Sequence, residues 1–259
     1  MFDVDGTLVH RAGDDLHVQP GAREVLARIR ASGRPLALFT NGSHETPEGF
    51  AAGLRGVGLD VADDELLTPL RSVLVYLREH GYESVLLLGS DPAREFLEQA
   101  GVLVLAGEDA TDADVVFVAT PAAFDFGELE RAARTVLGGA PLLTGSYAPA
   151  YAGANGPIIS RGAMVTAALA KASGARPVIV GKPSRAALRT ISDQVGARSR
   201  ELAVIGDDVT MDIALGRMGD SRTILVRSGI SGPVEPEALP RRHRPDAVVD
   251  GIAELLDWL

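Results

Sequence analysis

Asp3-Val4-Asp5-Gly6-Thr7, near the start of the chain, places two carboxylates two residues apart and follows them with a glycine and a hydroxyl. Residues i and i+2 of an extended chain point to the same side, so Asp3 and Asp5 are expected to face one site. Two like charges held together need a cation or another partner. Mg²⁺ prefers oxygen ligands and commonly binds one or two carboxylates together with a substrate phosphate. The segment therefore indicates a magnesium site beside an aspartate that could attack phosphorus, with an ordinary turn or part of a calcium site as the alternative.

Short apolar runs alternate with amphipathic stretches along the whole chain. Strands that are buried on both faces of a parallel sheet appear as nearly continuous apolar runs. Their alternation with helices predicts an α/β fold with a mainly parallel sheet. The expected strands are Leu36–Thr40, Val85–Gly89, Val115–Ala119, Val178–Gly181, Leu202–Gly206, Thr223–Val226 and Ala247–Val249. The expected helices are Ala22–Ala31, Pro69–His80, Pro92–Ala100, Gly127–Leu137, Gly162–Ser173, Arg185–Val195 and Gly251–Leu259.

The first strand is expected to be very short. Only Met1 and Phe2 precede Asp3, whereas strands typically run about five residues. We therefore expect that a few natural residues upstream of Met1 are missing from this sequence. Fewer ladder hydrogen bonds beside Asp3 would weaken the positioning of the loop that follows it.

The composition is that of an ordinary globular protein, with 46% apolar and 23% charged residues among 259. This length predicts one or two domains. The net charge of −10 argues against a nucleic-acid partner, because nucleic-acid binders usually carry a basic footprint. The basic string Arg241-Arg242-His243-Arg244 is interpreted as a solvated loop rather than a nucleic-acid patch.

Three features favour a cytoplasmic location. The sequence has no apolar run of about 18 residues, so no membrane span or membrane partner is expected. Its N-terminus carries no basic segment followed by an apolar one, which argues against export. It has no cysteine, which excludes disulfides, thiolate catalysis and cysteine-ligated metals.

A second polar cluster ends an expected strand. Leu38-Phe39-Thr40-Asn41-Gly42-Ser43 passes from apolar residues to a hydroxyl, an amide, a glycine and another hydroxyl. Side-chain and backbone donors of this kind can bind phosphate, and ligands of open α/β sheets lie beyond the carboxyl ends of the strands. Thr40, Asn41 and Gly42 are therefore candidate phosphate-binding residues. The alternative is a turn that leads to a helix capped by Ser43 or Thr46.

A lysine follows another expected strand, in Val180-Gly181-Lys182-Pro183-Ser184. Lys182 would place a compact cation beside a bound phosphate, where it could offset charge on the aspartate and on the transferring group. A surface lysine is the alternative reading. Ser184 is expected to be the N-cap of the helix that begins at residue 185.

A second group of acids follows the expected strand Leu202–Gly206. Asp207 could bind the metal opposite Asp3. Asp212 could support the metal through water or could pair with Lys182. Asp208 could support the metal or simply cap a helix, because acids are favoured at helix N-termini. Taken together, the strand ends offer an acid pair, a hydroxyl, a lysine and further acids in chain order.

With these four segments, the chain resembles the haloacid dehalogenase (HAD) superfamily of phosphohydrolases. The four motifs of that superfamily correspond to Asp3-Val4-Asp5-Gly6-Thr7, Thr40-Asn41, Lys182 and Gly206-Asp207 with Asp212. The Gly-Lys-Pro-Ser and Thr-Asn-Gly-Ser strings are similar to those of the NagD / para-nitrophenyl phosphatase branch, which carries a type IIA cap. Pro20-Gly21-Ala22 before a helix fits as well. Met211 departs from the branch, which commonly has threonine immediately before the last motif aspartate.

The resemblance implies a role for each motif residue. Asp3 attacks phosphorus and forms an aspartyl-phosphate, while Asp5 protonates the leaving oxygen and later deprotonates water. Thr40 and the backbone N–H of Asn41 hold phosphate oxygens, and Lys182 stabilises charge. The ligands of Mg²⁺ are Asp3, the Asp5 carbonyl and Asp207, with Asp208 or Asp212 in support.

The spacing of the motifs and the resemblance together predict where a cap domain is inserted. Too few residues lie between Leu8 and Leu36 for a cap, whereas about 140 lie between Asn41 and Lys182, enough for an α/β domain. We therefore predict a Rossmann-like parallel-sheet core formed by residues 1–63 and 176–259, with an inserted C2-type α/β cap at 64–175. Within the cap, 145–157 reads as a loop whose two tyrosines could line the substrate entrance. Caps of this branch often dimerise, so a homodimer is a candidate assembly.

The leading hypothesis is a Mg²⁺-dependent phosphatase that hydrolyses small phosphomonoesters such as sugar, glycerol, glycolate or nucleoside monophosphates. A phosphotransferase that passes the phosphoryl group to another acceptor is a second hypothesis. A phospho-aspartate signalling receiver and a non-catalytic phosphate-binding protein stay open as further readings.

Overall fold

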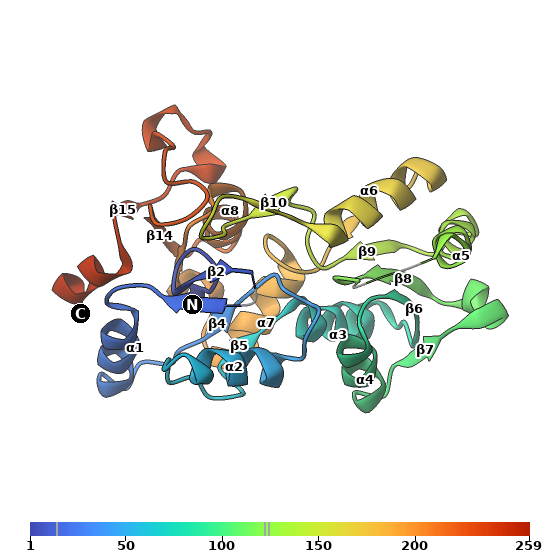
Figure 1. The fold of residues 1–259 in the computed structure, drawn as a ribbon, viewed down its shortest axis with the longest axis horizontal. Coiled ribbons are helices and arrows are strands. Elements are labelled where there is room, and N and C mark those ends of the chain that lie inside the picture. Colours follow the sequence, from blue (N-terminus) through green and yellow to red (C-terminus); the bar gives the residue numbers. More distant parts are fainter. Residues whose placement is uncertain (14, 122, 124) are drawn as a thin grey trace.

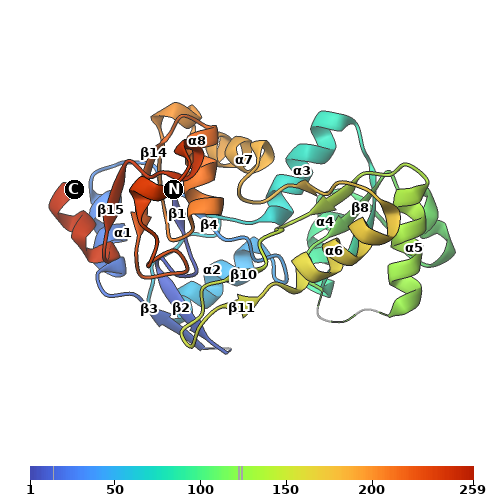
Figure 2. The same ribbon diagram turned by 90° about the horizontal axis from the view of Figure 1, so that it is seen from above.

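Two parallel sheets organise the chain (Figures 1 and 2). The structure is a computed structural model, which describes residues 1–13, 15–121, 123 and 125–259. The larger sheet has six strands in the order β15-β14-β13-β1-β4-β5, and the smaller has five in the order β12-β9-β8-β6-β7. The strands of the larger sheet are β1 Phe2–Asp3, β4 Leu38–Phe39, β5 Leu66–Leu67, β13 Ala203–Gly206, β14 Arg222–Val226 and β15 Ala247–Val249. The strands of the smaller sheet are β6 Ser84–Leu88, β7 Leu103–Leu105, β8 Val115–Val118, β9 Leu142–Thr144 and β12 Val178–Ile179.

Helices cover both sheets and bury their apolar strands. Val85, Val115 and Phe117 are fully buried beneath α3 and α4, while Val116 and Val118 pack on the opposite face against α5 and α6. This two-sided burial explains the continuous apolar runs of these strands. The α-helices are α1 Ala22–Ala31, α2 Pro47–Gly56, α3 Pro69–His80, α4 Asp91–Gln99, α5 Phe126–Leu137, α6 Arg161–Ser173, α7 Arg185–Val195 and α8 Ala214–Met218.

The predicted α/β fold with parallel sheets is confirmed. Each of the seven expected strand ranges overlaps an observed strand, and β1 has the expected short length of two residues. Ser184 caps α7 as expected, since its side chain accepts a hydrogen bond from the N–H of Ala187. The smaller sheet is built from residues that lie between β5 and β13 of the larger one, as an insertion requires.

Some elements differ from the expectation. The segment between Leu8 and Leu36, where the expected helix Ala22–Ala31 lies, also forms an antiparallel hairpin of β2 Val9–Ala12 and β3 Asp15–Val18, which was not predicted. Helix α2 was not among the expected helix ranges, but it matches the alternative of a helix capped at Thr46, whose side chain accepts a hydrogen bond from the N–H of Gly49. The C-terminal stretch expected as an α-helix is a 3-10 helix over Ile252–Trp258.

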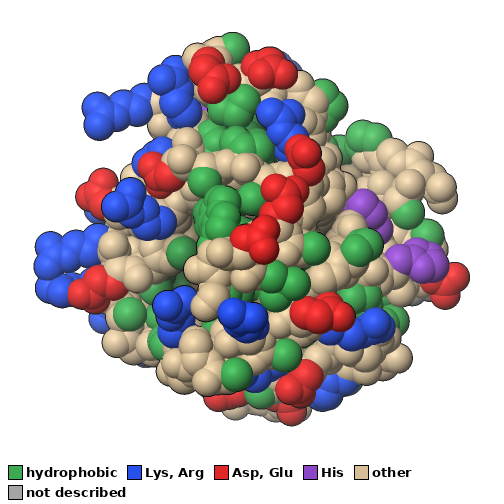
Figure 3. All heavy atoms as spheres, turned by 90° about the vertical axis from the view of Figure 1, so that its left-hand side faces the viewer, with side chains coloured by type: hydrophobic (Ala, Val, Ile, Leu, Met, Phe, Trp, Pro, Cys, Tyr) green, Lys and Arg blue, Asp and Glu red, His purple; other side chains and the backbone are tan. Residues whose placement is uncertain are grey.

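The division at residues 64 and 175 stays a prediction. The strands nearest to these positions are β5, which pairs with β4 in the larger sheet, and β12, which pairs with β9 in the smaller sheet. Among the described residues, no helix is long and apolar enough to cross a membrane. The face in Figure 3 carries basic and acidic side chains interspersed rather than in separate patches.

Candidate active site

The register of the larger sheet brings three of the sequence motifs together. Strand β1 lies between β13 and β4, and Phe2 pairs with both Ile205 and Leu38. The strands are parallel, so their carboxyl ends meet at one edge, where ligands of open α/β sheets bind. Asp3, Thr40 and Asp207 therefore emerge side by side.

Lys182 reaches the same edge by a different route. It follows β12, which belongs to the smaller sheet, and so lies on the link between the two sheets. Its side chain is only 1% exposed, and its Nζ donates to Asp3 Oδ1 at 2.5 Å, to Asp212 Oδ1 at 2.7 Å and to the Phe39 carbonyl at 2.9 Å. All three N–H bonds of the ammonium are thus satisfied inside the protein. The alternative of a surface lysine is wrong, because the Lys182 side chain is buried and, as a buried cation requires, paired with carboxylates.

Three buried carboxylates surround this lysine. Asp3, Asp207 and Asp212 each offer an oxygen within 4.8 Å of the others, and each is at most 7% exposed. Burial raises the pKa of Asp3 to about 7, against the opposing effect of Lys182. Burial raises the pKa of Asp207 well above its usual range, and the carboxylates of Asp3 and Asp212 add to that shift.

The chemistry of this donor set fits a divalent cation. For Lys182 itself, burial lowers the pKa, but Asp212 and Asp3 outweigh burial and the net shift is upward. One lysine cannot neutralise three carboxylates, so an excess of buried negative charge remains. Hard divalent cations prefer such clusters of carboxylate oxygens. The fit is therefore good for Mg²⁺ or Ca²⁺, and it is poor for a metal that favours sulfur or imidazole ligands.

The other two acids of the segment after β13, Asp208 and Asp212, have different hydrogen-bond partners. Asp208 accepts hydrogen bonds from the N–H groups of Thr210 and Met211, which makes it the cap of the turn Val209–Ile213, as the capping alternative predicted. Asp208 is absent from the buried carboxylate cluster. Asp212 pairs with Lys182 and also accepts from the Asp208 N–H at 3.1 Å, so its position is held although Met211 precedes it.

The backbone of two glycines packs closely against the Asp207 carboxylate. A Cβ at Gly229 would lie 1.8 Å from Asp207 Oδ2, and one at Gly6 would lie 2.4 Å from the same atom. Gly6 also has φ +93°, a conformation that side chains disfavour. The Ile230 N–H donates to Asp207 Oδ2 at 2.7 Å. Backbone therefore approaches this carboxylate so closely that only glycine fits at either position.

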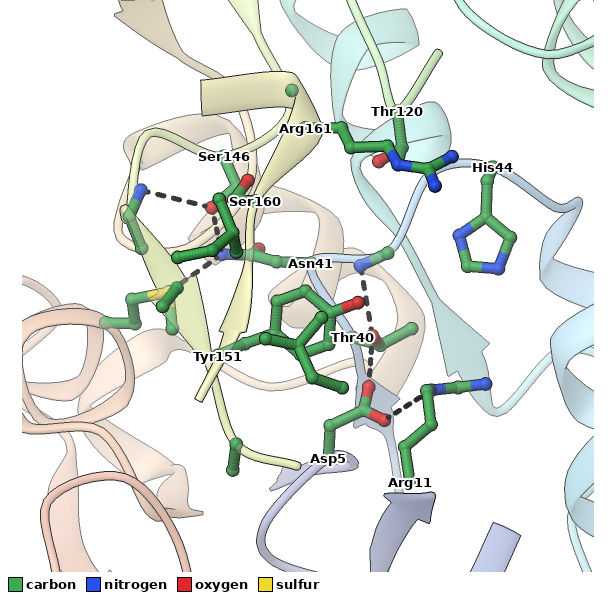
Figure 4. A pocket seen from close by; sticks show the side chains of 18 of the residues that line it. Asp5, Arg11, Thr40, Asn41, His44, Thr120, Ser146, Tyr151, Ser160 and Arg161 are labelled. Carbon is green, nitrogen blue, oxygen red and sulfur yellow. Dashed lines mark hydrogen bonds and ion pairs between the residues drawn. The ribbon is translucent and has the colours of Figure 1, made fainter. Parts of the chain in front are cut away.

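Asp5, two residues beyond the end of β1, lines the cavity (Figure 4). Its Oδ2 accepts a hydrogen bond from Thr40 Oγ1 at 3.2 Å, and its Oδ1 is 3.3 Å from Arg11 Nε. The Thr40 hydroxyl oxygen in turn accepts from the Gly42 N–H at 3.0 Å. Arg11 was not predicted at the site, because it lies on β2, in the hairpin that the sequence did not predict.

Asn41 uses its side chain to fix the lysine loop. Its Nδ2 donates to the Lys182 carbonyl at 2.9 Å, and its Oδ1 accepts from the Lys182 N–H at 2.7 Å. The same amide contacts Ser146 Oγ at 3.4 Å and Met211 Sδ at 3.2 Å. The Asn41 side chain is thus a positioning element, and only its backbone stays a candidate phosphate donor.

A cavity of about 400 Å³ joins these residues to the elements of the smaller sheet. Hairpin β10 Ala150–Tyr151 with β11 Ile158–Ile159 covers it, and the Ala154 N–H donates to the Arg11 carbonyl at 2.8 Å. The two hairpins therefore meet over the site. Of the two tyrosines expected at the entrance, Tyr151 lines the cavity and Tyr147 is absent from its lining.

Sequence reasoning did not find four other lining residues, His44, Thr120, Ser160 and Arg161. Only Ser160 carried a local signal, since a serine before a helix is a common N-cap and it accepts from the Ala163 N–H. The other three lie on loops or helix starts whose place over the cavity depends on the tertiary fold.

Comparison with known proteins identifies the family. A family model described as haloacid dehalogenase-like hydrolase matches residues 1–103, and a HAD-hydrolase-like model matches residues 179–255. Ribonucleotide monophosphatase NagD of Escherichia coli (strain K12) is 30% identical over 255 residues, which cover 98% of this chain and 96% of NagD. The chain belongs to the haloacid dehalogenase-like hydrolase family.

Further relatives and solved structures are similar over most of their length. Dihydroxyacetone phosphatase of Corynebacterium glutamicum (strain R) is 29% identical over 266 residues, covering 99% of this chain and 90% of that protein. The structure of p-nitrophenyl phosphatase from Archaeoglobus fulgidus superposes with a TM-score of 0.85 at 25% identity, covering 100% of this chain and 98% of the other. The NagD structure gives a TM-score of 0.86 at 28% identity, covering 98% and 96%. The predicted resemblance to the NagD / para-nitrophenyl phosphatase branch is confirmed.

Proposed function

We propose that this HAD family member is a Mg²⁺-dependent phosphatase that hydrolyses small phosphomonoesters through an aspartyl-phosphate intermediate. The observation that carries the proposal is the setting of Asp3. This buried carboxylate lies among two further acids and one lysine, and it opens on a cavity of about 400 Å³. A cavity of this size suits a small metabolite.

Two hydrogen bonds fix the orientation of the Asp3 carboxylate, as an attacking group requires. Its Oδ1 accepts from Lys182 Nζ and its Oδ2 accepts from Thr7 Oγ1 at 3.0 Å, so the carboxylate cannot rotate freely. In the first step, an oxygen of Asp3 bonds to phosphorus while the bond from phosphorus to the leaving oxygen breaks. A proton from Asp5 passes to that leaving oxygen, so a neutral alcohol departs.

In the second step, water replaces the aspartyl group. Asp5, now a carboxylate, takes a proton from water as the water oxygen bonds to phosphorus and the Asp3–phosphorus bond breaks. Its two hydrogen bonds, to Thr40 and Arg11, fix the carboxyl group at the cavity wall. The Thr40 hydroxyl and the backbone of Asn41 and Gly42, which line the cavity beside Asp5, are the donors proposed for the phosphate oxygens.

Asp3, Asp207 and the carbonyl of Asp5 would hold the Mg²⁺, with Asp212 supporting through its contact with Lys182. When bound, Mg²⁺ supplies positive charge that favours the ionised form of Asp3 and offsets the charge of the phosphate. Lys182 contributes further positive charge through its contact with Asp3. In-line phosphoryl transfer depends mainly on such positioning and charge neutralisation.

Residues 64–175 are proposed to be the cap that selects the leaving group. Relatives named as a ribonucleotide monophosphatase and a dihydroxyacetone phosphatase support small phosphomonoesters as the substrate class. The hairpin β10–β11 over the cavity supports exclusion of water during the reaction.

The test is phosphate release from a panel of phosphomonoesters with Mg²⁺, comparing the parent protein with Asp3→Asn. The matched control is Asp193→Asn, which makes the same change at an exposed ion pair on α7. The parent and the control should release phosphate, and Asp3→Asn should lose at least 10³-fold in kcat, an order of magnitude typical of a lost covalent nucleophile. Equal activity of Asp3→Asn and the parent would overturn the mechanism. Consumption of the substrate that requires an added alcohol, and that yields a new phosphate ester in place of inorganic phosphate, would identify a phosphotransferase instead.

A further inference from the structure

The charges that line the cavity are divided unevenly between its two sides. The carboxylates in the lining, Asp3, Asp5 and Asp207, all lie at or just beyond the ends of strands of the larger sheet. The described lining residues between 119 and 162 are alanine, glycine, isoleucine, proline, serine, threonine, tyrosine and a single charged side chain, Arg161. The side of the cavity that would face a leaving group therefore carries one cation and no acid.

Arg161 differs from the other cations of the cavity in having no protein partner. Lys182 is paired with Asp3 and Asp212, and Arg11 is paired with Asp5. Within the described part of the chain, no hydrogen bond or ion pair engages the Arg161 guanidinium, which is exposed to the cavity. Its planar set of N–H donors matches a carboxylate or phosphate, which it can bind through two parallel hydrogen bonds.

Neutral polar groups accompany this arginine. Figure 4 shows Arg161, Thr120 and His44 pointing into the same part of the cavity, and Tyr151 lies between them and Asp5. The Thr120 hydroxyl is fixed by a 3.0 Å hydrogen bond with Ser43. Burial lowers the pKa of His44, with Arg11 adding to the shift, so at neutral pH the imidazole is a neutral hydrogen-bonding group. Arg161 is then the group that can offset charge on a ligand.

Resting on the proposed function, we propose that Arg161 binds a second anionic group on the leaving portion of the substrate. The preferred substrates are accordingly small phosphomonoesters that also carry a carboxylate or a second phosphate, rather than phosphates of neutral polyols. An anion at Arg161 and a phosphoryl group at Asp3 would both lie within one cavity of about 400 Å³. Arg161 thereby acts as a specificity-determining residue.

The test uses substrate pairs that share a carbon skeleton and differ in one terminal group, which is anionic in one member and neutral in the other. 3-Phosphoglycerate and glycerol 3-phosphate share a skeleton but end in a carboxylate and a hydroxymethyl group. The pair of 1,3-propanediol bisphosphate and 3-hydroxypropyl phosphate examines a second phosphate in the same way. The readout is the ratio of kcat/KM within each pair, for the parent and for Arg161→Gln. The control is Arg78→Gln, at an exposed arginine on α3 outside the cavity lining.

In the parent, the ratio should favour the anionic member of at least one pair, and that pair identifies the source of the anion. In Arg161→Gln this ratio should fall about tenfold or more, as expected for a lost charge-assisted hydrogen bond. Arg161→Lys should recover part of it, and Arg78→Gln should not change it. Parent ratios near one, or ratios that Arg161→Gln leaves unchanged, would overturn the inference while the phosphatase function stands.

A binding measurement separates this inference from the proposed mechanism. Calorimetric titration of 3-phosphoglycerate and glycerol 3-phosphate into Asp3→Asn, with and without Arg161→Gln, needs no turnover. The same set extends to 1,3-propanediol bisphosphate and its hydroxypropyl partner. Tighter binding of an anionic member that disappears with Arg161→Gln supports the inference even if no phosphate is released. Equal affinities within both pairs would refute it.

Discussion

Replacing Lys182 with methionine should destabilise the protein strongly. Methionine fills similar volume but leaves Asp3 Oδ1, Asp212 Oδ1 and the Phe39 carbonyl without the ammonium that lies 2.5, 2.7 and 2.9 Å from them. The lysine is only 1% exposed, so water cannot easily replace it. Breaking a buried ion pair by removing one partner costs about 3–5 kcal/mol.

The expected loss is measurable by thermal and urea unfolding in EDTA. At about 2–4 °C per kcal/mol for chains of roughly this size, the midpoint should fall by about 10 °C. The chain has a second lysine, Lys171, which is exposed on α6, so Lys171→Met is a matched control that should change stability by less than about 0.5 kcal/mol.

A double mutant decides whether the cost arises from unpaired charge. Adding Asp212→Asn to Lys182→Met removes one of the stranded carboxylates, so the double mutant should be more stable than Lys182→Met alone. The reasoning is refuted if Lys182→Met costs less than about 1 kcal/mol, or if Asp212→Asn destabilises the parent and Lys182→Met equally.

Three further predictions follow from single contacts. Asp207→Asn relieves repulsion within the buried acids, so the free energy of unfolding in EDTA should rise by about 1 kcal/mol. Mg²⁺ at 100 Kd should stabilise the parent by about 2.7 kcal/mol, and this stabilisation should vanish in Asp207→Asn. An unchanged response to Mg²⁺ would contradict the proposed metal site. Gly229→Ala places a Cβ 1.8 Å from Asp207 Oδ2, so Mg²⁺-dependent turnover should fall at least tenfold, whereas Gly53→Ala, with open space around it, should be nearly silent. Hydrogen bonds from the N–H of Glu83 and from Ser84 hold the pKa of Asp114 below its usual value, so the stability it contributes is present at neutral pH and is lost as pH falls through that lowered pKa. Asp114→Asn should therefore cost on the order of 1 kcal/mol at pH 7 and less at pH 3 in urea unfolding, and a cost independent of pH would contradict this assignment.

Hydrophobic continuity made the buried strands predictable, while short or atypical elements escaped. Residues 115–118 are all buried, and this gave a clear signal. Helix α2 contains glycines at 49, 53 and 56, which lower its intrinsic helix propensity, so its N-cap Thr46 and Pro47 at its start were the remaining local cues. The segment at 252–258 has a helical pattern, but all of it forms a 3-10 helix, and hydrophobic periodicity does not distinguish this from an α-helix.

The core of the site was predictable for a topological reason that does not extend to the cap. Carboxyl ends of adjacent parallel strands share an edge, so the order β13-β1-β4 alone brings Asp207, Asp3 and Thr40 together. No topological rule of this kind predicts the position of Arg161. Its place at the cavity depends on where the smaller sheet and the hairpin β10–β11 lie relative to the larger sheet. Chemistry common to many substrates can thus be read from strand order, whereas substrate choice depends on a three-dimensional arrangement of loops. A single substitution at Arg161 should accordingly alter which leaving group is accepted without altering how phosphorus is attacked, and this is the separation that the paired substrates measure.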